Sequence, residues 1–283
     1  MPTYHTPTPI DLAMNLQVGA IEVCASDRTD TVVTVSPTNP AKAVDRRGAE
    51  ETTVDFDGQR ISIAGPRPRI SWLGFGPTES VDLAVELPTG SRLTAEIAVG
   101  SLRTVGRLGA TRIKSSTGAV EVDTTGDLWL RASHGNATVG VVEGGTEITA
   151  DHGQIRVGSV TGDAVLKASH GSVLVGESGS DLDARLSYGG LEITRALASV
   201  SAKTAYGSIE LREVSSGSIQ VESGFGQVTV GVRPGVPAWL DLSSKNGHVR
   251  NQLVGDRAPD PSEQTVAVRA RTQVGDITIQ RAR

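Results

Sequence analysis

A short glycine-centred motif recurs along most of this chain and limits its fold more than any other feature. Each copy has a glycine, one variable residue, and then alternating apolar and polar positions, as in DHGQIRV (151–157) and SHGSVLV (169–175). The motif glycines are spaced 17 to 19 residues apart and are Gly100, Gly118, Gly135, Gly153, Gly171, Gly189, Gly207 and Gly226. Weaker copies surround Gly19, Gly247 and Gly275. Self-similarity at a fixed period indicates stacked structural repeats.

The residues after each glycine alternate as they do in a half-buried strand. In the copy at 151–157, Ile155 and Val157 share one face and Arg156 points to the other. Half a period further on lies a second segment with similar alternation, such as TGDAVLKA (161–168). Each repeat therefore predicts two short strands joined by glycine-marked turns.

A unit of about 18 residues cannot close a core of its own, so neighbouring units must stack and pair their strands. The sequence predicts an all-β protein, a single-stranded parallel β-solenoid (β-helix) with coils of about 18 residues, and we expect a right-handed coil. Aromatic residues make up only 3% of the chain, so Val, Ile, Leu and Ala must fill the core. We expect the motif glycines to be structural, at turns that need a positive φ.

The first third of the chain departs from the repeat. Residues 1–95 are expected to form N-terminal strands and an irregular cap, and residues 96–283 the repeat solenoid, as one continuous domain. Turn-forming residues at 45–48 indicate a loop, while Thr53–Phe56 and Arg60–Ala64 flank Asp57-Gly58 as in a β-hairpin.

With these residues in view, the chain resembles the bacterial putative-adhesin family of β-strand-repeat proteins, whose coils carry a Ser/Thr-x-Gly-x-Val/Ile-x-Val/Ile signature. Toast-rack domains of envelope-stress proteins are a related type. The resemblance covers nearly the whole chain, most securely residues 80–283, and includes the opening coil around Gly19-Ala20-Ile21-Glu22-Val23. It implies the solenoid fold and brings no catalytic residues with it.

A column of ring-bearing residues precedes the motif glycines: His134, His152, His170, Tyr188, Tyr206 and Phe225. Three histidines can ligate zinc, so His134, His152 and His170 are the candidates for a metal site. Coils about 4.8 Å apart would hold these rings side by side, whereas zinc needs converging ligands. We therefore favour a structural ladder and predict no metal; a pH-sensitive switch is the other alternative.

A second candidate is an aromatic cluster in the irregular region. Trp72 and Phe75 lie close together and follow Arg67 and Arg69. They could plug the end of the solenoid core, or they could form a partner-binding surface, since aromatic residues and Arg favour interface cores. We expect the plug.

Several classes of function are disfavoured. The net charge of −5 does not suit nucleic-acid binding. No nucleotide-binding or zinc-protease motif is present, so we predict no cofactor and no catalytic residues. No segment is apolar enough to cross a membrane and no signal peptide is recognisable, so we expect a cytoplasmic protein.

The leading hypothesis is a non-enzymatic scaffold or protein-interaction module that presents a repetitive solenoid surface to an unknown protein partner. One alternative is a self-assembling polymer subunit, and an oligomer of identical chains is left open. Another is a polysaccharide-acting β-helix enzyme, for which Asp181 and Asp183 alone would be too few carboxylates. The sequence identifies neither the partner nor the oligomeric state.

Overall fold

The computed structural model describes residues 2–66, 70–71, 74–75, 79–253 and 265–282, and it confirms the all-β solenoid. Of the described residues, 69% lie in strands and 3% in a helix. The hand of the coil stays a prediction. The chain divides into two compact units, Met1–Val139 and Gly140–Arg283, and β13 (Ala137–Val142) leads from the first into the second.

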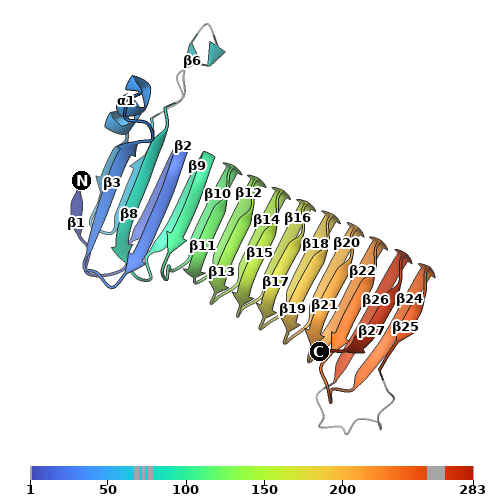
Figure 1. Cartoon of the computed structure of the whole chain (residues 1–283). Coiled ribbons are helices and arrows are strands. Elements are labelled where there is room, and N and C mark those ends of the chain that lie inside the picture. Colours follow the sequence, from blue (N-terminus) through green and yellow to red (C-terminus); the bar gives the residue numbers. More distant parts are fainter. Residues whose placement is uncertain (1, 67–69, 72–73, 76–78, 254–264, 283) are drawn as a thin grey trace. The chain divides into compact units, whose positions relative to one another are not determined.

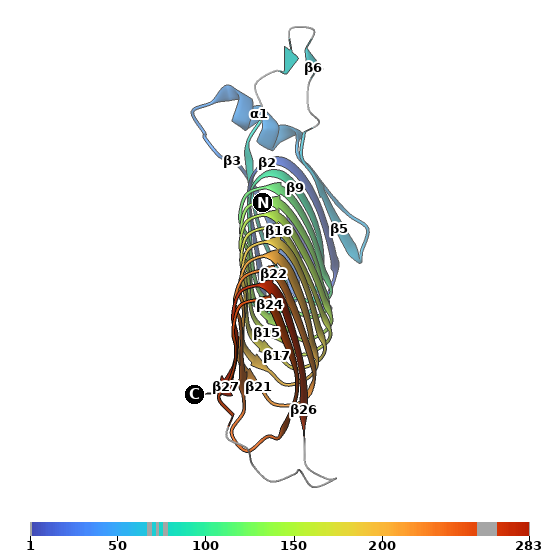
Figure 2. The same cartoon turned by 90° about the vertical axis from the view of Figure 1, so that its right-hand side faces the viewer.

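The second unit consists of stacked coils, each with two short strands (Figure 1). Seen nearly end-on, a coil is a flattened loop with one strand on each long side (Figure 2). One side is formed by β14 (Thr146–His152), β16 (Ala164–His170), β18 (Leu182–Tyr188), β20 (Val200–Tyr206), β22 (Gly217–Phe225), β26 (Val266–Val274) and β24 (Ala238–Asn246). The other side is formed by β15 (Ile155–Val160), β17 (Val173–Ser178), β19 (Leu191–Ala196), β21 (Ile209–Val214), β23 (Val228–Val232), β27 (Ile277–Arg281) and β25 (Val249–Asn251).

Pairing within each side is parallel, and equivalent positions of successive repeats lie opposite each other. Ile148 pairs with Leu166, and Leu166 with Ala184, each 18 residues along. Because every side chain keeps its face from coil to coil, the apolar positions form continuous buried rows. Ile155, Val173 and Leu191, for example, are each at most 2% exposed. Aliphatic side chains thus fill the interior, as the low aromatic content requires.

The last coils of this unit are not stacked in chain order. Strand β26 lies between β22 and β24, and β27 lies between β23 and β25. The segment 238–251 is therefore outermost, although 266–281 follows it in the sequence. Among the described strands, β26 is the only partner of β24 and β27 the only partner of β25.

The first unit also contains a segment, β2, that is stacked out of chain order. Its elements are β1 (Thr3–His5), β2 (Asp11–Ser26), β3 (Asp30–Pro37), α1 (Ala43–Glu51), β4 (Thr53–Phe56), β5 (Arg60–Ala64), β6 (Ile70–Ser71), β7 (Gly74–Phe75), β8 (Val81–Pro88), β9 (Arg92–Val105), β10 (Thr111–Thr117), β11 (Val120–Thr125) and β12 (Leu128–His134). Strand β2 pairs along its length with β9, and its two halves pair with β5 and β8 on the other side. The opening coil thus lies inside the stack.

Antiparallel strands cover the outermost coil of the first unit. Strand β3 pairs with β8 and β1 with β3, while β4 pairs with β5 as the sequence-predicted hairpin. The expected loop at 45–48 lies instead within α1. Its Asp45 is buried and accepts hydrogen bonds from the backbone N–H groups of Asn39 and Ser80, which tie the helix to the strands beside it. Such long-range bonds are invisible in the local sequence.

Candidate functional site

The motif glycines lie at the turn between the two strands of a coil. All eight have positive φ, from 131° at Gly118 to 157° at Gly226. A Cβ on Gly189 would run into the carbonyl oxygen of Gly171, and a Cβ on Gly207 into that of Gly189. The turn therefore requires glycine for two reasons, its backbone conformation and the close approach of the neighbouring coil.

The ring-bearing residues beside these glycines form a stacked column in the second unit. Ring centroids are 4.8 Å apart for His152 and His170, 5.1 Å for His170 and Tyr188, 5.0 Å for Tyr188 and Tyr206, and 4.9 Å for Tyr206 and Phe225. The planes are within 9° of parallel. The rings of His170, Tyr188 and Tyr206 are thus stacked on both faces, and Tyr188, Tyr206 and Phe225 are about half exposed.

The histidine geometry bears on the candidate metal site. His152 and His170 stack at an interplanar angle of 2°, so their ring nitrogens lie side by side. His134 belongs to the first unit. Within the described ranges, no group of three or more His, Cys, Asp or Glu side chains is arranged to hold a metal ion.

Most of the aromatic cluster predicted to plug the core or bind a partner, namely Arg67, Arg69 and Trp72, lies outside the described residues. Phe75 is described only as part of β7, which pairs antiparallel with β6. The choice between plug and partner surface stays a prediction.

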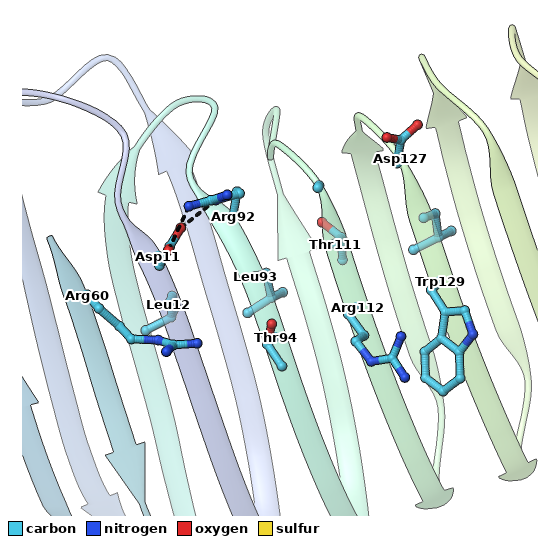
Figure 3. Close-up of a pocket in the computed structure, with 12 residues that line it drawn as sticks. Asp11, Leu12, Arg60, Arg92, Leu93, Thr94, Thr111, Arg112, Asp127 and Trp129 are labelled. Carbon is cyan, nitrogen blue, oxygen red and sulfur yellow. Dashed lines mark hydrogen bonds and ion pairs between the residues drawn. The ribbon is translucent and has the colours of Figure 1, made fainter.

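A groove that the sequence did not reveal crosses the outer face of the first unit. It spans five neighbouring strands in the order β5, β2, β9, β10, β12 and has a volume of about 420 Å³. We call it the arginine–tryptophan groove, after Arg60, Arg92, Arg112 and Trp129. Figure 3 shows Arg60 at one end of the groove and Trp129 at the other.

Two of the three guanidinium groups in this groove are held in place. Arg92 makes a two-point ion pair with Asp11, with Nε–Oδ1 and Nη2–Oδ2 distances of 2.5 and 2.7 Å. The Cζ atom of Arg112 lies 3.7 Å from the centroid of the Trp129 ring, a cation–π contact (Figure 3). A stacked guanidinium keeps its N–H edge free for hydrogen bonds in its own plane. Arg60 makes no ion pair within the described residues.

The second unit has a hollow of opposite character. Asp163, Asp181 and Asp183 line it together, and Asp163 is one 18-residue repeat before Asp181, so the repeat spacing itself places these two side by side. All three carboxylates are engaged. Asp163 accepts a hydrogen bond from the Ser180 hydroxyl, Asp181 accepts one from the Ser199 backbone N–H, and Asp183 pairs with Arg185.

Among the described residues, four carboxyl groups have a pKa that lies below the ordinary value. The Arg28 side chain lowers the pKa of Asp30, the Arg271 side chain lowers that of Asp241, and backbone N–H groups lower those of Asp57 and Asp276. A carboxyl that serves as a general acid near neutral pH needs a raised pKa. These four groups are therefore stabilised as anions.

The comparison with family models identifies the family. The Toastrack DUF4097 model matches residues 11–280. The chain belongs to this family, as the resemblance of its Gly-x-Val-x-Val coils indicated. The match begins at β2 and ends in β27. It therefore includes the two places where strands are stacked out of chain order, β2 in the first unit and β26 with β27 in the second. No curated protein matches the chain.

Three solved structures are similar over nearly their whole length. A "putative cell adhesion protein" from Clostridium sporogenes is 13% identical, with 98% of this chain and 94% of that chain covered and a TM-score of 0.20. A "putative adhesin" from Parabacteroides distasonis is 11% identical, with 99% and 95% covered and a TM-score of 0.31. Another from Parabacteroides merdae is 11% identical, with 100% and 95% covered and a TM-score of 0.29. Likeness at this level says nothing of what this chain binds.

No described helix has the length and apolar character needed to cross a lipid bilayer.

Proposed function

We propose that this Toastrack protein is a non-enzymatic interaction module whose arginine–tryptophan groove binds an acidic segment of a partner protein. The observation that carries the proposal is the arrangement of Arg112 on Trp129, with Arg60 across the groove. Planar guanidinium groups recognise carboxylates through paired N–H donors, and the aromatic face holds one of them in a fixed direction.

The rigid sheet beneath the groove supports this use. Leu12, Leu93 and Leu128 form part of its floor and are at most 3% exposed, so the strands that carry the arginines are anchored in the core. Side chains on a packed sheet are held more exactly than side chains on loops, which lowers the entropy lost on binding.

The test compares partners captured by matched variants. Wild-type protein, Arg60→Ala/Arg112→Ala and the control Arg156→Ala/Arg185→Ala would each be immobilised and exposed to the same cell lysate. We expect at least one protein to be retained by wild type and control and lost from the groove variant. Its acidic segment, as a synthetic peptide, should bind the groove variant at least about tenfold more weakly in calorimetry, since two charge-assisted contacts are removed. Equal retention by all three proteins would contradict the proposal.

A further inference from the structure

The outer edge of β24 is a strand edge without a partner in the described structure. Eight of its nine residues pair with β26 on one side, so alternate backbone N–H and C=O groups on the other side face away from the sheet. Leu240 and Leu242, which continue the core row, are only half-buried, whereas their neighbours Val268 and Ala270 on β26 are at most 2% exposed. An edge of this length, with apolar side chains behind it, is a template for another strand.

The charge pattern of β24 is complementary to itself. Trp239, Asp241, Ser243 and Lys245 are all on its exposed face. If a second copy of β24 runs antiparallel, with Ser243 opposite its own copy, Asp241 faces Lys245 of the other chain. The two-fold symmetry repeats the same pair on the other side of Ser243. Opposite charges placed directly across neighbouring strands are stabilising.

The other residues of this face fit the same register. Trp239, which is 71% exposed, falls opposite Gly247 of the second copy, the first residue after β24, which has no side chain to compete for space. Asp241 would lie between Lys245 of the second copy and Arg269 of its own chain, whose Nε is 3.0 Å from the Asp241 carboxylate. Cations would then flank the carboxylate from both sides.

We propose that two copies of this chain form a dimer through antiparallel pairing of their β24 edges, in the register that places Ser243 opposite itself. The interface is isologous, so each copy uses up the same edge and assembly stops at two chains instead of continuing as a polymer. This dimer does not depend on the arginine–tryptophan groove.

Sedimentation velocity over graded protein concentrations tests the dimer. Wild-type protein should show a species of twice the 29.4 kDa chain mass. Lys245→Glu places two carboxylates opposite each other at both symmetric sites, and it should raise the dimer dissociation constant by about tenfold or more. The control Lys114→Glu makes the same charge change on an exposed residue of the first unit and should leave it unchanged.

A mixing experiment tests the register. Asp241→Lys should also weaken self-association, but an equal mixture with Lys245→Glu restores opposite charges at both sites and should recover the dimer. If Asp241→Lys does not fold, as judged by circular dichroism, the difference between Lys245→Glu and Lys114→Glu decides. Three results would each overturn the proposal. They are wild-type protein that stays monomeric at about 100 µM, which is a weak affinity, a Lys245→Glu variant that dimerises with wild-type affinity, and a mixture of folded variants that stays monomeric.

Discussion

The outermost coils of the two units differ in how their strand edges are covered. In the first unit, the outermost coil is covered by antiparallel β3 and β4, and the strands left at the edge, β1 and β4, have only three and four residues. In the second unit, the outermost described strand is β24, with nine residues and half-buried leucines. Short edge strands discourage pairing with other chains, whereas a long regular one invites it.

An irregular sequence can thus protect the end of a solenoid from pairing with other chains. The segment between β2 and β9 has no repeat, yet its strands give the first unit its cover. The segment that forms β24 and β25 keeps the repeat almost to its end, and it leaves its edge available.

The first prediction compares one leucine from each outermost coil. Leu83 in β8 lies between Ile21 and Val35 and is 2% exposed, so Leu83→Ala should lower the free energy of unfolding by about 2 to 5 kcal/mol. Leu242→Ala should cost only about 1 kcal/mol, because its side chain is half-buried. Urea unfolding, with Lys245→Glu added to both variants to suppress dimers, measures the difference. Equal losses would show that the edge of β24 is covered as well as that of β8.

The second prediction compares one glycine from each outermost coil. Gly19 has a φ of 145°, and a Cβ there would run into the carbonyl oxygen of Val81. Gly19→Ala should therefore lower the free energy of unfolding by about 1 to 3 kcal/mol. A Cβ on Gly247 would meet the carbonyl oxygen of Gly275, but Gly247 has no positive φ and its coil is held from one side only. Gly247→Ala should cost less than about 1 kcal/mol. Thermal melts that rank the two variants the other way would contradict the contrast.

The third prediction concerns acid. Asp30 and Asp241 each have a pKa lowered by an arginine, Arg28 in the first unit and Arg271 in the second. A carboxyl with a depressed folded-state pKa contributes stability above its unfolded pKa, near 4, and this stability is lost as the pH falls through the folded value. Both groups are exposed, so the effect should be small and weaker in high salt. Asp30→Asn and Asp241→Asn should each unfold at a lower urea concentration than wild type at pH 7, with the difference disappearing in acid, once the pH has fallen through the lowered folded-state pKa. A gap that persists there would refute the electrostatic origin.

The regular coils could be predicted from sequence because each residue meets its own equivalent one repeat later. The spacing of 17 residues between Gly118 and Gly135 also places Arg112 beside Trp129, so this half of the groove could have been found by aligning repeats.

The rest of the groove could not have been found in this way. Arg60 reaches it because β5 pairs with β2, a contact between segments that share no repeat spacing. Similarly, α1 depends on Asp45 accepting hydrogen bonds from Asn39 and Ser80, on either side of the helix. Contacts between segments that are not related by the repeat depend on the tertiary structure, so no periodicity in the sequence reveals them.

The position of β26 and β27 inside the stack has a consequence for how the protein is made. During synthesis, residues 238–251 leave the ribosome before residues 266–281. Since β26 and β27 are the described strands on which β24 and β25 dock, the earlier segment must wait for the later one. Coils that stack in chain order can add one by one as they emerge, because each finds its neighbour already formed. The last two coils therefore stack in the order opposite to their synthesis. If a ribosome stalls before Val266, the edges of β22 and β23 have no strand paired with them.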